Sequence, residues 1–135
     1  MALFEWSSDF ETGVNSIDTQ HQKLVEYVNR LHDGMMEGQA AAALGIILDG
    51  LVAYTASHFK HEERIFDQIG YEQTAEHKDH HAKLVAQVVE FQTKFKAGDA
   101  TISMELMDFL KDWLMNHIMK EDMKYVEVFN ANNIS

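Results

Sequence analysis

Apolar residues recur every three or four positions through most of the chain, which is the repeat of amphipathic α-helices. The repeat predicts four long helices over residues 18 to 34–38, 39 to 70, 74 to 96–98 and 103 to about 129. Asp18 is a suitable N-cap for the first helix, and Gly70 a suitable end for the second. Proline is absent, so nothing in the sequence interrupts these helices.

The connections between the predicted helices are only a few residues long, which forces neighbouring helices to run antiparallel. We therefore expect an all-α protein, an up-down-up-down antiparallel four-helix bundle, in one domain covering residues 1–135. The bundle is expected over about 18–130 and an N-terminal arm over 1–17. Five apolar residues are expected to pack this arm across the bundle: Phe4, Trp6, Phe10, Val14 and Ile17.

Histidines are placed selectively in this helical pattern. Five of the eight continue the apolar stripes and are expected to face the core: His21, His58, His77, His81 and His117. Glu62 follows on the same face as His58. His61 and His80 fall in line with charged or polar residues and are expected at the surface. His32 lies three turns, about 16 Å, beyond the core-facing histidine of its own helix, too far to share a metal site.

The five core-facing histidines and Glu62 also fall at one level of an antiparallel bundle. One core-facing histidine is ordinarily a hydrogen-bonded packing residue. Five imidazoles and a carboxylate buried together would each cost several kcal/mol without partners, so packing alone does not explain the set. Metal coordination satisfies all of them, and the sequence therefore predicts a metal site inside the bundle.

Composition narrows the choice of metal site and partner. The chain has no cysteine, which excludes disulfides, thiolate zinc sites, iron–sulfur clusters and cysteine nucleophiles. The formal charge of −11 argues against nucleic acid and anionic membrane surfaces as partners and is explained by solubility. Because there is neither a signal peptide nor a run of eighteen apolar residues, we expect no membrane insertion and a cytoplasmic location.

Four motifs resemble the bacterial members of the hemerythrin family: IDTQH (17–21), HFKHEERIF (58–66), HKDHH (77–81) and HIMKED (117–122). Trp6, Phe10 and Gly13 are similar to the family's N-terminal arm. The resemblance implies two iron ions (Fe²⁺/Fe³⁺) with a bridging oxo or hydroxo group. It implies these ligands: His77, His81 and His117 on one iron, His21 and His58 on the other, and Glu62 and Asp122 bridging both.

The choice of Asp122 rests on the resemblance alone. Asp122 lies five residues after His117, about 140° around an ideal helix, whereas Glu121 occupies the more favourable fourth position. A carboxylate that bridges two metals must reach sideways to both, and we follow the family in choosing Asp122.

The implied ligand set leaves the iron with two histidines one ligand short of six, so a small molecule can bind there. The resemblance then implies reversible dioxygen binding for storage or delivery, with no enzymatic activity and with an oxygen-consuming enzyme as a recipient. Trp113, Leu114 and Ile118 are candidates for the lining of the oxygen pocket, although plain core packing explains them equally well. The alternatives are oxygen or redox sensing through the same site, and di-iron oxidase or nitric oxide chemistry.

Overall fold

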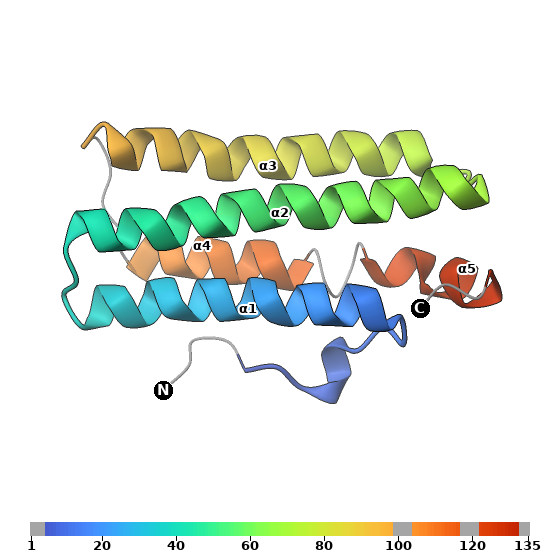
Figure 1. Ribbon diagram of the computed structural model, residues 1–135, viewed down its shortest axis with the longest axis horizontal. Helices are drawn as coiled ribbons and strands as arrows, with labels where there is room; N and C mark the ends of the chain where they lie inside the picture. Colours follow the sequence, from blue (N-terminus) through green and yellow to red (C-terminus); the bar gives the residue numbers. More distant parts are fainter. Residues whose placement is uncertain (1–4, 99–103, 117–121, 133–135) are drawn as a thin grey trace.

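The computed structural model describes residues 5–98, 104–116 and 122–132. The helices in chain order are η1 (Ser8–Phe10), α1 (Asn15–Met36), α2 (Ala41–Ile69), α3 (Thr74–Lys96), α4 (Met104–Met115), η3 (Asp122–Tyr125) and α5 (Val126–Ala131). The four long helices alternate in direction along a common axis (Figure 1). The predicted all-α, up-down-up-down bundle is confirmed.

The N-terminal arm lies along α1 (Figure 1). The buried apolar residues of the core form a larger and a smaller cluster. Trp6 and Phe10 pack against the larger cluster, with their rings 5.6 Å apart. Val14 is 1% exposed and belongs to the smaller cluster, so the arm contributes to both.

The buried apolar residues form two clusters. The larger is built from α1, α2, α3 and α4 and includes Leu24, Leu51 and Leu110. The smaller joins the other ends of α1 and α2 to the C-terminal segment: Val14, Ile17, Ile65, Phe66, Tyr125 and Phe129. Along α1 and α2, buried polar residues occupy the positions between these clusters. The core thus consists of two apolar parts with a polar layer between them.

Two predicted helix boundaries are wrong. Helix α1 begins at Asn15, three residues before the expected N-cap, and Val14 takes the cap position without a side-chain hydrogen bond. Asp18 instead accepts hydrogen bonds from the backbone N–H and the hydroxyl of Thr12, both at 2.8 Å. The predicted fourth helix is also not a regular α-helix to residue 129, because the 3₁₀ turn η3 lies within it.

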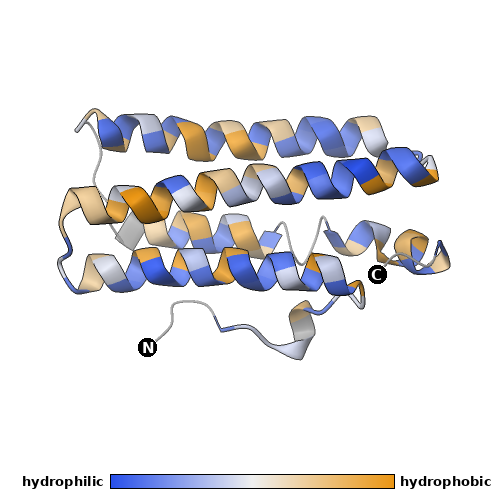
Figure 2. Ribbon diagram, in the orientation of Figure 1, coloured by the Kyte–Doolittle hydropathy of each residue, from blue (hydrophilic) through white to orange (hydrophobic). Residues whose placement is uncertain are grey.

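Helix α2 ends as predicted, at Gly70, which adopts a left-handed conformation with φ of 68°. Its apolar residues are concentrated in its first half (Figure 2), and its second half carries His58 and Glu62. By length and composition α2 could cross a membrane. Its most apolar stretch of 18 residues has a mean hydropathy of 1.4, and 39% of that stretch is buried inside the protein. The central helix of a bundle meets the same criteria, so this is weak evidence for a membrane span.

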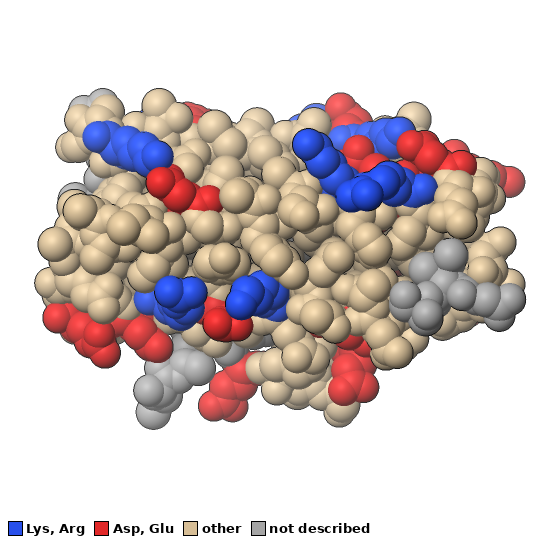
Figure 3. Space-filling model, in the orientation of Figure 1, with Lys and Arg blue, Asp and Glu red and all other residues tan. Residues whose placement is uncertain are grey.

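Charged side chains of both signs lie interspersed on the face drawn in Figure 3. Several pair between neighbouring helices, as Lys78 of α3 does with Asp67 of α2 at 3.0 Å. Lys96 of α3 likewise contacts Asp49 of α2 at 2.8 Å, and this contact lowers the pKa of the Asp49 carboxyl. These exposed pairs contribute little to stability individually but favour the observed pairing of α2 with α3.

Candidate metal centre

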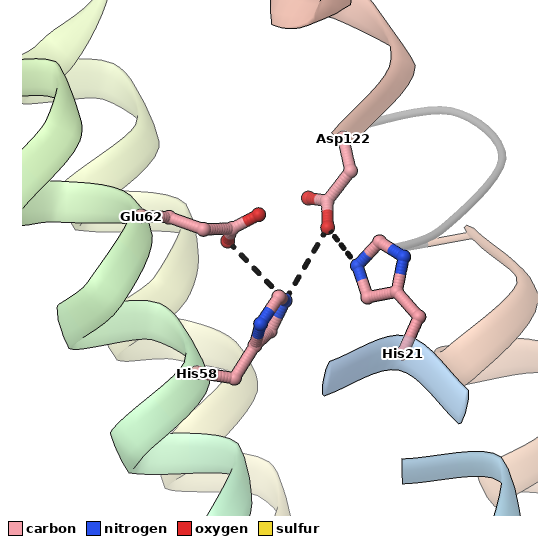
Figure 4. Close-up of side chains that lie close together, drawn as sticks. All are labelled: His21, His58, Glu62 and Asp122. Atoms are coloured by element: carbon pink, nitrogen blue, oxygen red, sulfur yellow. Dashed lines mark hydrogen bonds and ion pairs between the residues drawn. The ribbon is translucent and has the colours of Figure 1, made fainter. Parts of the chain in front are cut away.

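Four side chains from three elements converge in the polar layer of the core (Figure 4). They are His21 of α1, His58 and Glu62 of α2, and Asp122 of η3. Each offers one nitrogen or oxygen atom, and these atoms all lie within 4.8 Å of one another. All four residues are at most 1% exposed. Nitrogen and oxygen donors this close together, and shielded from water, form an arrangement that can hold a cation.

The donor atoms face one another directly. Nε2 of His21 contacts Oδ2 of Asp122. Nε2 of His58 lies 3.4 Å from the same Asp122 oxygen and 3.5 Å from Oε1 of Glu62 (Figure 4). Both imidazoles therefore direct Nε2 towards the carboxylates at the middle of the cluster.

Helix α3 adds two further imidazoles. His81 is 2% exposed, and its Nε2 lies 3.3 Å from Oε1 of Glu62. Its ring stacks on Phe59, with centroids 4.0 Å apart. His77 is 4% exposed, and its ring centroid lies 6.3 Å from that of His81. Six of the seven predicted ligands are thus buried in this region, while His117 lies outside the described residues.

The buried carboxyl group of Glu62 lies near that of Asp122, and both its burial and this neighbour affect its pKa. Burial raises the pKa of Glu62 well above its usual range, and the nearby Asp122 carboxyl raises it further. A cation between the two groups would remove this penalty, because it would compensate both negative charges. Imidazole nitrogens together with carboxylate oxygens suit iron and other transition metals, so these residues fit a non-haem iron site.

Two residues outside the predicted set hold the imidazoles in place. Nδ1 of His58 lies 2.7 Å from Oε1 of Gln20, and Nδ1 of His81 lies 2.9 Å from Oε2 of Glu63. A hydrogen bond at Nδ1 leaves the Nε2 lone pair free to bind a metal, and such outer contacts are common around metal-binding histidines. Neither residue was predicted from the sequence, although each directly adjoins a predicted ligand.

The three histidines excluded as ligands lie outside the cluster of possible ligands found among the described residues. His61, expected at the surface, is half-buried, with Nε2 3.1 Å from the hydroxyl oxygen of Ser16. This burial lowers the pKa of the His61 imidazole, and Arg64 lowers it further. Nδ1 of His32 lies 3.6 Å from Asp33, and His80 lines a groove between α3 and α4.

The candidate pocket residues lie in different surroundings. Leu114 is fully buried in the larger apolar cluster. Trp113 is 5% exposed and lines the groove between α3 and α4, which has a volume of about 470 Å³. Ile118 lies outside the described residues. A role of these residues in an oxygen pocket stays a prediction.

Comparison with known proteins identifies the family of this chain. Residues 12–129 match the family model described as the hemerythrin HHE cation binding domain. The chain is 39% identical over 127 residues to a bacteriohemerythrin of Pseudomonas aeruginosa (strain LESB58), covering 94% of this chain and 82% of that protein. It is 40% identical over 132 residues to the bacteriohemerythrin of Methylococcus capsulatus, covering 97% of this chain and 100% of that protein.

Solved structures agree with these matches. A crystal structure of wild-type hemerythrin superposes with a TM-score of 0.87 and 39% identity, covering 93% of this chain and 97% of that one. A leucine-to-alanine variant of hemerythrin gives a TM-score of 0.88 at 39% identity, covering 94% and 97%. The chain therefore belongs to the hemerythrin family, whose members bind oxygen at a non-haem iron site.

Proposed function

We propose that this protein binds dioxygen reversibly at two iron ions joined by an oxo or hydroxo bridge, and thereby stores oxygen or delivers it to an oxygen-consuming enzyme. The observation that carries the proposal is the convergence of buried imidazoles and carboxylates from α1, α2 and η3. The donor types suit iron, and family membership favours oxygen binding over other uses of such a site.

Seven side chains would hold the irons: His21, His58, Glu62, His77, His81, His117 and Asp122. When bound, the irons supply the electrons and the open coordination position that dioxygen binding requires. The protein holds the imidazoles with Nε2 directed inward, through the contacts of His58 with Gln20 and of His81 with Glu63. Glu62 lies between His58 of α2 and His81 of α3, which are assigned to different irons, and this position suits it to bridge them. Asp122 contacts His21 and His58, and its bridging role is proposed from family membership.

A carrier must also keep water away from the bound oxygen, because water and added protons promote irreversible oxidation of the site. Leu114 is completely buried, and Trp113 is nearly so. In the proposal these two residues and Ile118 keep the oxygen position dry. None of them needs to transfer a proton.

Anaerobic reduction followed by cycles of oxygen exposure and removal tests this function. The absorption spectrum of the iron-loaded protein should change when oxygen is added and return when oxygen is removed, over several cycles. Sustained oxygen consumption in the presence of a reductant, with many turnovers per site, would contradict a carrier and support oxidase chemistry at the same centre.

A further inference from the structure

The two imidazoles that contact Glu62 have chemically different acceptors behind them. His58 is hydrogen-bonded through Nδ1 to the neutral side-chain amide of Gln20, at 2.7 Å. His81 is hydrogen-bonded through Nδ1 to the carboxylate of Glu63, at 2.9 Å. The two halves of the cluster are therefore alike in their inward-facing Nε2 atoms and unlike in what supports them.

The contact of Glu63 with His81 is well defined. His81 is 2% exposed and Glu63 is 26% exposed, so the hydrogen bond connects the core to the outer surface of α2. A carboxylate can only accept a hydrogen bond, which requires Nδ1 of His81 to carry the proton. Stacking on Phe59 holds the ring in this orientation.

A carboxylate and an amide act differently on a metal-binding imidazole. A carboxylate attracts the Nδ1 proton more strongly, so the ring gains negative character and its Nε2 becomes a stronger donor to a metal. A neutral amide fixes the ring orientation with a smaller effect on donor strength. A stronger donor raises metal affinity and stabilises the higher oxidation state.

We propose that Glu63 is a positioning residue that makes the His81 half of the centre the stronger metal-binding half and the half with the lower reduction potential. This inference rests on the proposed di-iron function, in which His81 and His58 bind different irons. Under that assignment, the half supported by Gln20 is also the half with the open coordination position. His58, the weaker donor, then binds the iron that has the open position for dioxygen. His81, the stronger donor, binds the iron that has no open position.

Two substitutions separate the charge from the hydrogen bond. Glu63→Gln keeps an acceptor for Nδ1 of His81 and removes the negative charge. Gln20→Glu adds a charge behind His58 and should act in the opposite direction. Glu90→Gln is the matched control, because Glu90 is an exposed carboxylate of α3 that pairs with Lys94. This control removes one negative charge without touching the centre.

Two measurements on the iron-loaded protein, made without oxygen at pH 8, test the proposal. Glu63→Gln should weaken iron retention against a chelator by about tenfold or more, the scale found when an outer contact of a metal ligand is lost. It should also raise the midpoint reduction potential of the iron bound by His81 by about 59 mV. For one electron, this shift corresponds to a tenfold change in the equilibrium constant. Gln20→Glu should strengthen retention and lower a potential, and Glu90→Gln should change neither.

Failure of this inference differs from failure of the proposed function. If Glu63→Gln behaved like Glu90→Gln in both measurements, the role of Glu63 would be overturned. If the potentials shifted as expected but the parent protein did not release oxygen reversibly, only the carrier function would be rejected. If Glu63→Gln does not fold, the midpoint potential of Gln20→Glu tests the proposal instead. An unchanged potential in Gln20→Glu would contradict the proposal.

Discussion

Tyr125 is 1% exposed, and its hydroxyl has no hydrogen-bond partner among the described residues. A buried polar group without a partner costs about 1–3 kcal/mol. Tyr125→Phe keeps the ring between Phe66 and Phe129 and removes only the hydroxyl. We expect the free energy of unfolding of the metal-free protein to stay the same or rise by about 1 kcal/mol, as measured by urea denaturation.

The control for this substitution is Tyr71→Phe. The hydroxyl of Tyr71 donates a hydrogen bond to exposed Gln73 at 3.3 Å, so its loss should change stability by less than about 0.5 kcal/mol. A loss of more than about 1 kcal/mol in Tyr125→Phe would show that the hydroxyl stabilises the native state.

Burial and the neighbouring Asp122 raise the pKa of Glu62 well above its usual value near 4.5. A group whose pKa is raised by folding contributes stability below its unfolded pKa and loses that contribution as the pH rises through the folded pKa. The metal-free protein should therefore become less stable as the pH rises from about 4.5. Glu62→Gln should flatten this dependence in urea unfolding series. An equally steep decline in that variant would assign the effect to other groups.

Individual site residues were predictable to different degrees. The inward direction of His58, His77 and His81 follows from helical register, because their positions continue the apolar stripes. Register favoured Glu121 over Asp122, and Glu121 lies outside the described residues. Asp122 lies in a 3₁₀ turn, where the angular spacing of an α-helix does not apply, and its carboxylate contacts His21. Gln20 was not predicted, because its contact with a histidine of another helix depends on tertiary packing.

At Gly50 of α2, the ring of Tyr27 from α1 leaves little room for a side chain. A Cβ atom there would lie 2.7 Å from the ring of Tyr27, whereas a Cβ at Gly45 would meet Phe95 at an ordinary 3.7 Å. Alanine is favoured over glycine in a helix by about 1 kcal/mol. Gly45→Ala should therefore raise the free energy of unfolding by up to about 1 kcal/mol. Gly50→Ala should lower it by about 1 kcal/mol, because displacing a ring costs about 1–3 kcal/mol.

Thermal and urea unfolding of the two glycine variants would check this difference. Both substitutions make the same chemical change in the same helix, so propensity cancels in the comparison. Equal stabilisation by both would mean that the Tyr27 ring moves aside at no cost.

The existence of the long helices was predictable from periodicity, whereas their ends were less so. The C-terminal end of α2 needs a positive φ that suits Gly70, and a glycine can be recognised in the sequence. The start of α1 is different, because Asp18 is a good N-cap residue that is used inside the first turn. Its carboxylate holds Thr12 and Gly13 of the preceding loop, a contact that depends on how the arm folds back.

At the scale of the whole molecule, the polar layer separates a larger apolar cluster from a smaller one. The smaller cluster contains Tyr125 and Phe129 from the C-terminal segment. Asp122 joins this segment to α1 and α2 through its contacts with His21 and His58. A metal bound at the layer would therefore tie the C-terminal segment and its apolar cluster to the rest of the bundle.

Removal of the metal should loosen the two parts of the core unequally. Binding to the native state alone stabilises it by about 2.7 kcal/mol when the free metal is at a hundred times its Kd, so the metal-free protein should melt at a lower temperature. Amide exchange should accelerate most in η3, α5 and the last turns of α2, whose contacts depend on the centre, and least around Leu24 and Leu51 of the larger cluster.

Hydrogen exchange of iron-loaded and chelator-treated protein measures this difference, and chelator added to protein that is already metal-free is the control. Equal acceleration in both clusters would contradict a local role of the centre, and identical melting temperatures would contradict any coupling of metal binding to the fold.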